Sequence, residues 1–181
     1  MSTTDKDLGY ARLLQEMKKA NGAILDVGIF DGETQPASDG EPLSVAQIGA
    51  VHEFGSDDGR VPRRPWMSTA VDEKRSTWFE RFDRFRDRFL QARGAIPFLH
   101  TLTAAGEFCA SDVRLKITEG PWKEKAPATL AREGQRFTRP LIWLGYMRAV
   151  VRSRIVMMGV RRMTPKEAPS PGGSPPRQGG R

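Results

Sequence analysis

The chain has 181 residues and a formal net charge of +7, and hydrophobic residues make up 38% of it. This length and composition suit one globular domain, or one domain with a tail. A single cysteine excludes a disulfide framework, and two histidines leave few ligands for a zinc site. The sequence has no run of roughly 20 apolar residues for a membrane span and no signal-like start, so we expect a reducing cytoplasm.

Charge is segregated along the sequence. Residues 21–59 contain eight acidic residues and no lysine or arginine, whereas residues 134–166 contain eight cations and no acidic residue. Such blocks either neutralise each other within one fold, meet across a contact between subunits, or place the basic block against nucleic acid.

The first part of the chain predicts two helices with a strand between them. The segment from Asp7 to Ala20 has helical spacing, with acidic residues near its start and Asn-Gly after its end. The β-rich run from Ala23 to Phe30 predicts a strand. Ser44 and Gln47 predict a capping box for a second helix, which should end at Gly55.

The clearest predicted element is a long amphipathic helix from Asp72 to Arg93. One face of this helix is aromatic and consists of Trp78, Phe82, Phe85 and Phe89. Because an apolar helix face must be buried on another layer, we expect it to pack against a sheet formed by residues 23–30 and 149–160.

A second long helix is predicted from Pro97 to Glu119, followed by a strand from Ala149 to Val160. The expected buried stripe of this helix is Leu99, Leu102, Gly106, Cys109 and Val113. The glycine in this stripe would let a neighbouring element approach closely. The chain therefore predicts an α+β fold in which a small antiparallel sheet packs against long amphipathic helices. We expect a single domain at residues 1–164 and an extended Pro/Gly-rich tail at residues 165–181.

The sequence contains none of the common catalytic motifs. It has no Walker A loop, no GxGxxG and no GxSxG. His52 and Glu53 begin an HExxH pattern, but Ser56 replaces the second histidine, so His52 is expected only to gain from the negative end of a helix. We expect Cys109 to be a small core residue, and we expect no enzymatic activity, cofactor or metal. The enzymatic alternative is a metal-dependent nuclease that uses Glu53, Asp57 and Asp58.

Three segments carry further motifs. Residues 43–73 read LSVAQIGAVHEFGSDDGRVPRRPWMSTAVDE, residues 117–134 read ITEGPWKEKAPATLAREG, and residues 139–156 read RPLIWLGYMRAVVRSRIV. In this order they resemble the A-x-I-G-x-x-x-E-F-G … I-P-x-R-P-F-L, I-x-x-G-x-W-x-P-L-x-P-x-T-x-x-x-K-G and x-P-L-I-D-T-G-x-L-x-x-S-I-x-x-x-V motifs of the phage virion-morphogenesis family. These are the tail-completion or neck proteins of long-tailed double-stranded DNA phages. The resemblance covers about residues 20 to 160, with Trp143-Leu144 in place of the family's Asp-Thr.

The resemblance implies a structural virion protein without enzymatic activity. It implies an α+β protomer in a homo-oligomeric ring, expected to be a hexamer, at the phage neck or tail terminus. There the ring would join the head connector to the tail tube and let DNA pass through its lumen without sequence-specific contact. The implied partners are further copies of the chain, tail-tube proteins and connector or neck proteins, with no membrane and no cofactor. The implied location is the virion, with assembly in the host cytoplasm.

The alternative to a ring protein is a nucleic-acid-binding protein that uses the basic segment 136–162. The seven arginines of this segment would bind phosphates, and the affinity of the protein for DNA would fall steeply as salt rises.

Two groups of residues are candidates for binding a partner. Two prolines stiffen the loop RVPRRPW, in which Arg63 and Arg64 offer bidentate contacts to carboxylates. Trp66 is either an apolar anchor for the partner or a residue that packs under the long helix. For the charge blocks, we expect residues 31–58 of one subunit to contact residues 136–162 of the next, because a ring needs two different, complementary patches. The candidates in these blocks are Asp57, Asp58, Arg148, Arg152 and Arg154.

The tail gives a first testable prediction. Deleting residues 166–181 should leave the melting temperature of the isolated protein within about 1–2 °C, because a Pro/Gly-rich segment has little apolar surface to bury. Calorimetry of the full-length and shortened chains measures the difference. A larger fall would show that these residues belong to the folded domain.

Overall fold

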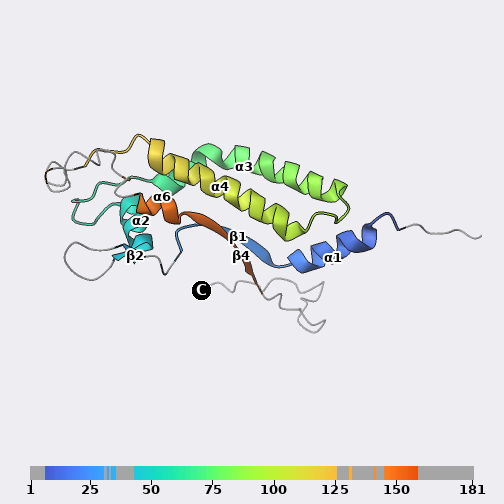
Figure 1. The fold of residues 1–181 in the computed structure, drawn as a ribbon. Coiled ribbons are helices and arrows are strands. Elements are labelled where there is room, and N and C mark those ends of the chain that lie inside the picture. Colours follow the sequence, from blue (N-terminus) through green and yellow to red (C-terminus); the bar gives the residue numbers. More distant parts are fainter. Residues whose placement is uncertain are drawn as a thin grey trace, which may run out of the picture.

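The structure, a computed structural model, describes residues 7–30, 32, 34–35, 43–125, 131, 141 and 145–158. Its elements are, in chain order, α1 (Tyr10–Ala20), β1 (Ala23–Gly28), β2 (Thr34–Gln35), β3 (Leu43–Ser44), α2 (Val45–Phe54), α3 (Trp66–Gln91), α4 (Phe98–Glu119), α6 (Tyr146–Val150) and β4 (Arg152–Met157). They form the expected α+β fold, in which an antiparallel β1–β4 ribbon packs against long helices (Figure 1). The expected domain boundary at residue 164 and the tail lie outside the described residues.

The long body of the molecule has three layers, with α4 in the middle. β1 pairs with β4 from Ala23 opposite Met157 to Gly28 opposite Arg152. α4 packs against both strands and also against α3 (Figure 1). The expectation that the aromatic face of α3 packs on the sheet is therefore wrong, because α4 lies between the two and takes that contact.

α4 approaches the ribbon closely at a glycine. A Cβ atom at Gly106 would lie 2.6 Å from Leu25 Cδ1 and 2.7 Å from Ser153 Cβ, so a larger residue would push the helix away from the strands. The buried members of the expected stripe are Gly106, Cys109 and Val113. Leu99, by contrast, is 36% exposed in the first turn of α4.

The helix and strand boundaries differ from expectation at three places. α3 begins at Trp66 rather than near Asp72, because Glu53 of α2 satisfies the N–H groups of this earlier turn. Ser44 occupies the N-cap of α2, but its side chain makes no capping hydrogen bond, so the expected capping box does not form. β4 is shorter than the expected strand at residues 149–160, because the residues before it form α6.

The aromatic face of α3 is directed at α4. Trp78 Nε1 donates a hydrogen bond to Asp112 Oδ2 at 2.7 Å. Phe89 is buried, and its ring centroid lies 5.2 Å from that of Phe98 in an edge-to-face arrangement. The other three aromatic residues of this face are only half-buried, so part of the face remains accessible between the two helices.

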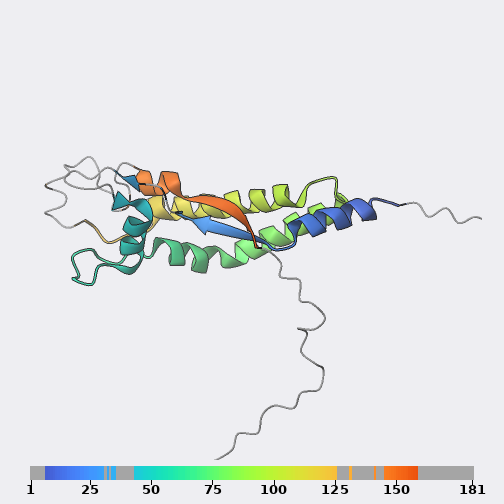
Figure 2. The ribbon, with the colours of Figure 1, turned by 90° about the horizontal axis from the view of Figure 1, so that it is seen from below.

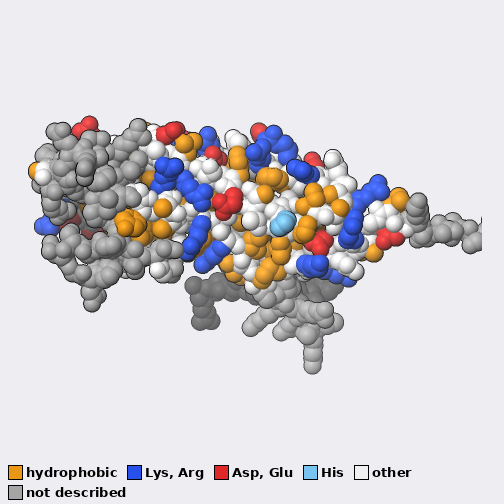
Figure 3. Space-filling view, in the orientation of Figure 1, with side chains coloured by type: hydrophobic (Ala, Val, Ile, Leu, Met, Phe, Trp, Pro, Cys, Tyr) orange, Lys and Arg blue, Asp and Glu red, His pale blue; other side chains and the backbone are white. Residues whose placement is uncertain are grey.

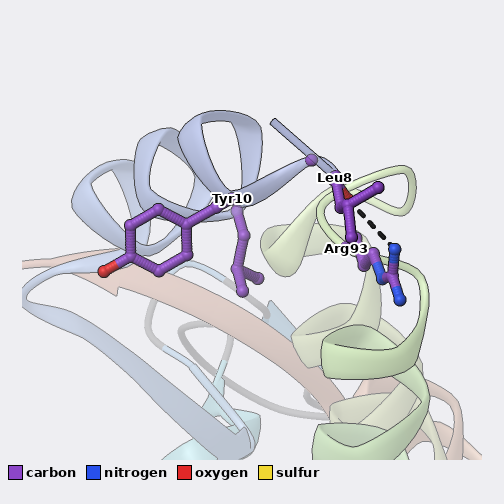
Figure 4. Close-up of a pocket in the computed structure, with 5 residues that line it drawn as sticks. Leu8, Tyr10 and Arg93 are labelled. Carbon is purple, nitrogen blue, oxygen red and sulfur yellow. Dashed lines mark hydrogen bonds between the residues drawn. The ribbon is translucent and has the colours of Figure 1, made fainter. Parts of the chain in front are cut away.

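α1 packs against the turn that joins α3 to α4, at the end of the molecule opposite α2 (Figures 1 and 2). Gly94 in this turn has a φ of +75°, and a Cβ there would lie 2.9 Å from the backbone of Arg12. Arg93 NH1 donates to the backbone oxygen of Leu8 at 3.3 Å, and both residues line a small pocket with Tyr10 (Figure 4). These contacts fix α1 on the end of the α3–α4 pair.

The close approach at Gly106 predicts a measurable cost of substitution. Gly106→Val should destabilise the protein by about 1–3 kcal/mol, because its side chain would overlap atoms of both strands. Ala104→Val is the matched control on the exposed side of α4, and should cost less than about 1 kcal/mol. Urea unfolding measures both. Equal losses would show that the helix can move away from the ribbon at little cost.

Candidate functional site

The loop between α2 and α3 holds several residues predicted to bind a partner. Its residues 56–61 close on themselves, since Ser56 N donates to Val61 O at 3.0 Å and Val61 N donates to Ser56 Oγ at 2.8 Å. Asp57 and Asp58 are exposed at its tip. The Ser56 hydroxyl and then the Arg60 N–H donate to Asp58, and these bonds lower the pKa of its carboxyl. The tip is therefore an ordered, acidic feature on the surface.

A buried glutamate of α2 caps the first turn of α3. Glu53 Oε2 accepts the Met67 N–H at 2.8 Å, and Oε1 accepts the Ser68 N–H at 3.0 Å and the Ser68 hydroxyl at 2.5 Å. Pro65, at the N-cap of α3, makes no side-chain cap of its own. A carboxylate is favourable here because the first N–H groups of a helix lack partners and form its positive end. The Glu53 carboxylate, which the nuclease alternative would use for catalysis, is thus engaged in holding α2 against α3.

Arg64 links the loop to the segment that follows α4. Its Nε donates to Lys123 O at 2.9 Å, its NH2 donates to Glu124 O at 3.1 Å, and its side chain and backbone together are 4% exposed. The expectation that Arg64 offers its guanidinium to a carboxylate of a partner does not fit this burial. The neighbouring Arg63 is exposed and stays a candidate for that contact.

His52 accepts a hydrogen bond from NH1, the third nitrogen of the Arg64 guanidinium. Arg64 NH1 lies 3.2 Å from His52 Nδ1, and because arginine only donates, Nδ1 carries no proton. Burial, followed by the charges of Arg64 and Lys125, lowers the pKa of His52 to about 4. The expectation that a cationic His52 gains from the end of α2 is therefore wrong, since the ring is neutral at pH 7.

Trp66 belongs to the core. It is 4% exposed, and its Nε1 donates to Gly49 O at 3.0 Å. A Cβ atom at Gly49 would lie 3.3 Å from the indole ring, so α2 meets this ring closely. Of the two interpretations of Trp66, the structure places it inside, under the start of α3, where a partner cannot reach it.

The basic candidates lie on α6 and β4. Arg148, Arg152 and Arg154 are all exposed. Arg154 Nε lies 3.3 Å from Asp26 Oδ2, and its guanidinium carbon lies 4.0 Å from the centroid of the Phe30 ring. One member of the basic block is thus paired with one member of the acidic block inside the same chain. The members of the blocks outside the described residues are Asp31, Glu33, Asp39, Glu41, Arg136, Arg139, Arg161, Arg162 and Lys166.

Groups that could perform chemistry are scarce in the described ranges. No three histidine, cysteine, aspartate or glutamate side chains lie close enough there to hold a metal ion. Burial, and to a lesser extent Asp112, raises the pKa of Cys109 to about 11, so its thiol stays protonated at neutral pH. The expectation that Cys109 is a core residue is confirmed. Within the same ranges, no helix has the length and apolar composition to span a membrane.

Sequence reasoning missed the capping role of two glutamates. Besides Glu53, the buried Glu16 of α1 accepts the N–H of Phe98, the first residue of α4, at 3.2 Å on Oε2. A hydrogen bond from Lys19 contributes most to lowering the pKa of Glu16, and the bond from Phe98 comes next. The sequence did contain a signal for these caps. A proline precedes each long helix, and because proline has no capping side chain, another residue must supply the cap.

The described parts of the three segments that resemble the family motifs meet at one end of the molecule, around α2, α6, the start of α3 and the end of α4 (Figure 1). One buried cluster there contains Val45, Trp66 and Ala70 of the first segment, Ile117 of the second, and Leu141, Met147 and Val151 of the third. Comparison of the chain with protein-family models, with curated proteins and with solved structures finds no match.

The neutral state of His52 predicts how stability depends on pH. The unfolded chain binds a proton at His52 near the ordinary pKa of 6.5, whereas the folded chain does so only near 4. Folding stability should therefore fall as pH drops from 6.5 to 4, by up to about 3 kcal/mol from this residue. His52→Asn keeps an acceptor but cannot titrate, so urea unfolding of the variant should lack this share of the loss. Identical pH profiles would contradict the assignment.

Proposed function

We propose that this protein is a structural virion protein of the phage neck or tail terminus, and that it forms a ring joining the head connector to the tail tube while DNA passes through. The observation that carries the proposal is the meeting of the three motif segments in one buried cluster. Segments that resemble a family at three separate places, and then pack on one another, support a shared structural unit rather than three chance matches.

The residues of the first motif also support a structural role. Glu53, Arg64 and Trp66 all make contacts inside the chain, where they hold α2, α3 and the segment after α4 together. This leaves a fixed corner whose loop presents Asp57 and Asp58 to solvent. A rigid surface loop loses little entropy when a partner docks on it, which suits an assembly protein.

A ring built from one chain needs two different surfaces that complement each other. The acidic loop tip supplies one of them, and basic surfaces elsewhere on the chain supply candidates for the other. The exposed Arg148, Arg152 and Arg154 are the candidates expected from the sequence, and Arg154 pairs with Asp26 inside the chain. Contacts between exposed charges are screened over about 8 Å at physiological salt, so a ring held partly by them weakens as salt rises.

The second candidate function is nucleic-acid binding, which one observation favours. Arg148 lines an open cavity of about 390 Å³ beside α6, together with Arg114, whose Nε donates to Val151 O at 2.8 Å. Guanidinium groups in this arrangement suit phosphate oxygens. This function predicts DNA affinity that falls steeply with salt and is lost in Arg148→Glu, without any need for a ring.

Light scattering and negative-stain electron microscopy of the purified protein test the ring, alone and with its tail-tube partner. We expect a closed ring at low salt that dissociates as salt rises. Asp57→Lys should weaken the ring while circular dichroism shows a folded monomer. Glu119→Lys, the same charge change at the end of α4, is the control and should assemble normally. A protein that stays monomeric under all these conditions rules out the ring, and strong DNA binding by that monomer would favour the second function.

A further inference from the structure

α2 presents an uncharged face to solvent. The exposed residues on this face are Gln47, Ala50, Val51 and Phe54. Phe54 is 74% exposed, more than any other aromatic residue that the structure describes. Val51, on the same face, is 42% exposed. The solvent face of a surface helix normally carries charged side chains. Here Glu53 is turned inward and His52 is neutral, so α2 ends in an apolar projection that nothing in the described part of the chain covers.

An apolar groove lies between α3 and α4. It has a volume of about 260 Å³, and its apolar lining consists of Phe82, Phe85, Phe98, Leu102 and Ala105. An apolar cavity of roughly 150 Å³ can hold a benzene molecule, so this groove has room for one phenyl ring. Three of its lining residues are themselves phenylalanines, which favour offset or edge-to-face contacts with another aromatic ring.

The two features lie at opposite ends of an elongated molecule. α2 lies at one end, and the groove lies toward the other end, where α3 turns into α4 and α1 packs against them (Figures 1 and 2). A projection at one end and a groove at the other cannot contact each other within one chain. They can be joined in successive copies from head to tail, which is the arrangement that generates a ring.

An exposed carboxylate beside the projection is matched by basic side chains near the groove. The tip of the loop after Phe54, residues 56–61, carries Asp57 and Asp58 against Arg60, which pairs with Asp58 at 3.1 Å, and Arg63 and Arg64 follow further along the loop. Residues 81–93 carry five arginines against two aspartates. Arg86 and Asp83 both line the groove and pair with each other at 2.6 Å, whereas Arg84 and Arg88 are exposed on the same helix. Figure 3 shows basic side chains interspersed with hydrophobic ones along α3 and α4. The exposed Asp57 beside the projection would therefore be attracted to the basic end that holds the groove.

We propose that Phe54 and Val51 of one protomer insert into the α3–α4 groove of a second copy of this chain. The proposal rests on the proposed ring and names the contact that builds it. It assigns the basic partner of Asp57 to the C-terminal part of α3, in place of the arginines on α6 and β4 that the sequence suggested.

The test uses cysteine pairs in two separately made proteins, with Ala50→Cys in one, so that Phe54 stays in place beside it, and Leu102→Cys in the other. After mixing under oxidising conditions we expect a disulfide between the two chains, detected as a dimer band on a non-reducing gel. Leu115→Cys is the control partner, because Leu115 is an exposed residue of α4 that does not line the groove. The buried, protonated Cys109 should not compete.

A second variant keeps the test decisive if Leu102→Cys fails to fold. Phe54→Glu changes an exposed side chain, so the monomer should keep its melting temperature while association weakens at least about 30-fold, as for an interface hot spot. Phe79→Glu is the matched control, since Phe79 is 57% exposed on α3 outside the groove. Both variants are compared by light scattering at equal concentration.

The outcomes separate this proposal from the ring itself. If the unmodified chain forms no ring, both are overturned. If the unmodified chain and Phe54→Glu both form the ring, only this contact is overturned. If Arg148→Glu abolishes the ring while Phe54→Glu does not, the contact lies at α6 and β4. A Phe54→Glu protein that assembles with itself but no longer binds the tail tube assigns the projection to a different protein and also overturns the proposal.

Discussion

The carboxylate of Glu53 at the start of α3 is the contact on which the arrangement of this end of the molecule depends. α3 and α4 both begin directly after a proline, and neither proline supplies a capping side chain. The first N–H groups of both helices would lack partners if nothing else approached them. Glu53 of α2 satisfies those of α3, and Glu16 of α1 satisfies one of α4. Each cap also fixes the position of the helix that carries the capping glutamate. The unpaired N–H groups of the two long helices therefore determine where the two short helices lie.

The orientation of α2 explains which of its residues reach solvent. Glu53 must point at α3, and Gly49 must face the Trp66 ring, so both lie on the inner side of this ten-residue helix. With helical spacing, the opposite side then carries Val51 and Phe54. The exposure of Phe54 is thus a geometric consequence of the cap. Its apolar character is not required by the fold, because a polar residue at this exposed position would leave every described contact of α2 unchanged.

The sequence was a good guide to the elements and a poor guide to what they touch. Periodicity and stop signals located α1 to α4 but not α6, and the close approach at Gly106 followed from a glycine in an apolar stripe. The order of the layers could not be obtained in this way, because an aromatic face such as that of α3 fits a helix as well as a sheet. Arg64 was expected on the surface because it lies in a polar loop. Its burial depends on carbonyl oxygens of residues 123 and 124, which are far away in the sequence.

The HEFG segment shows how these two kinds of information combine. Histidine, glutamate and glycine are explained by contacts within the chain: His52 accepts from Arg64, Glu53 caps α3, and Gly55 adopts a φ of +84° at the end of α2. Phe54 lies between them, makes no such contact, and is the most exposed residue of the HEFG segment. Burying a phenylalanine that is exposed in the monomer gains roughly 1.5–3 kcal/mol, so its natural place is an interface. A groove on the same chain that fits a phenyl ring makes another copy of the chain the simplest partner to supply that interface.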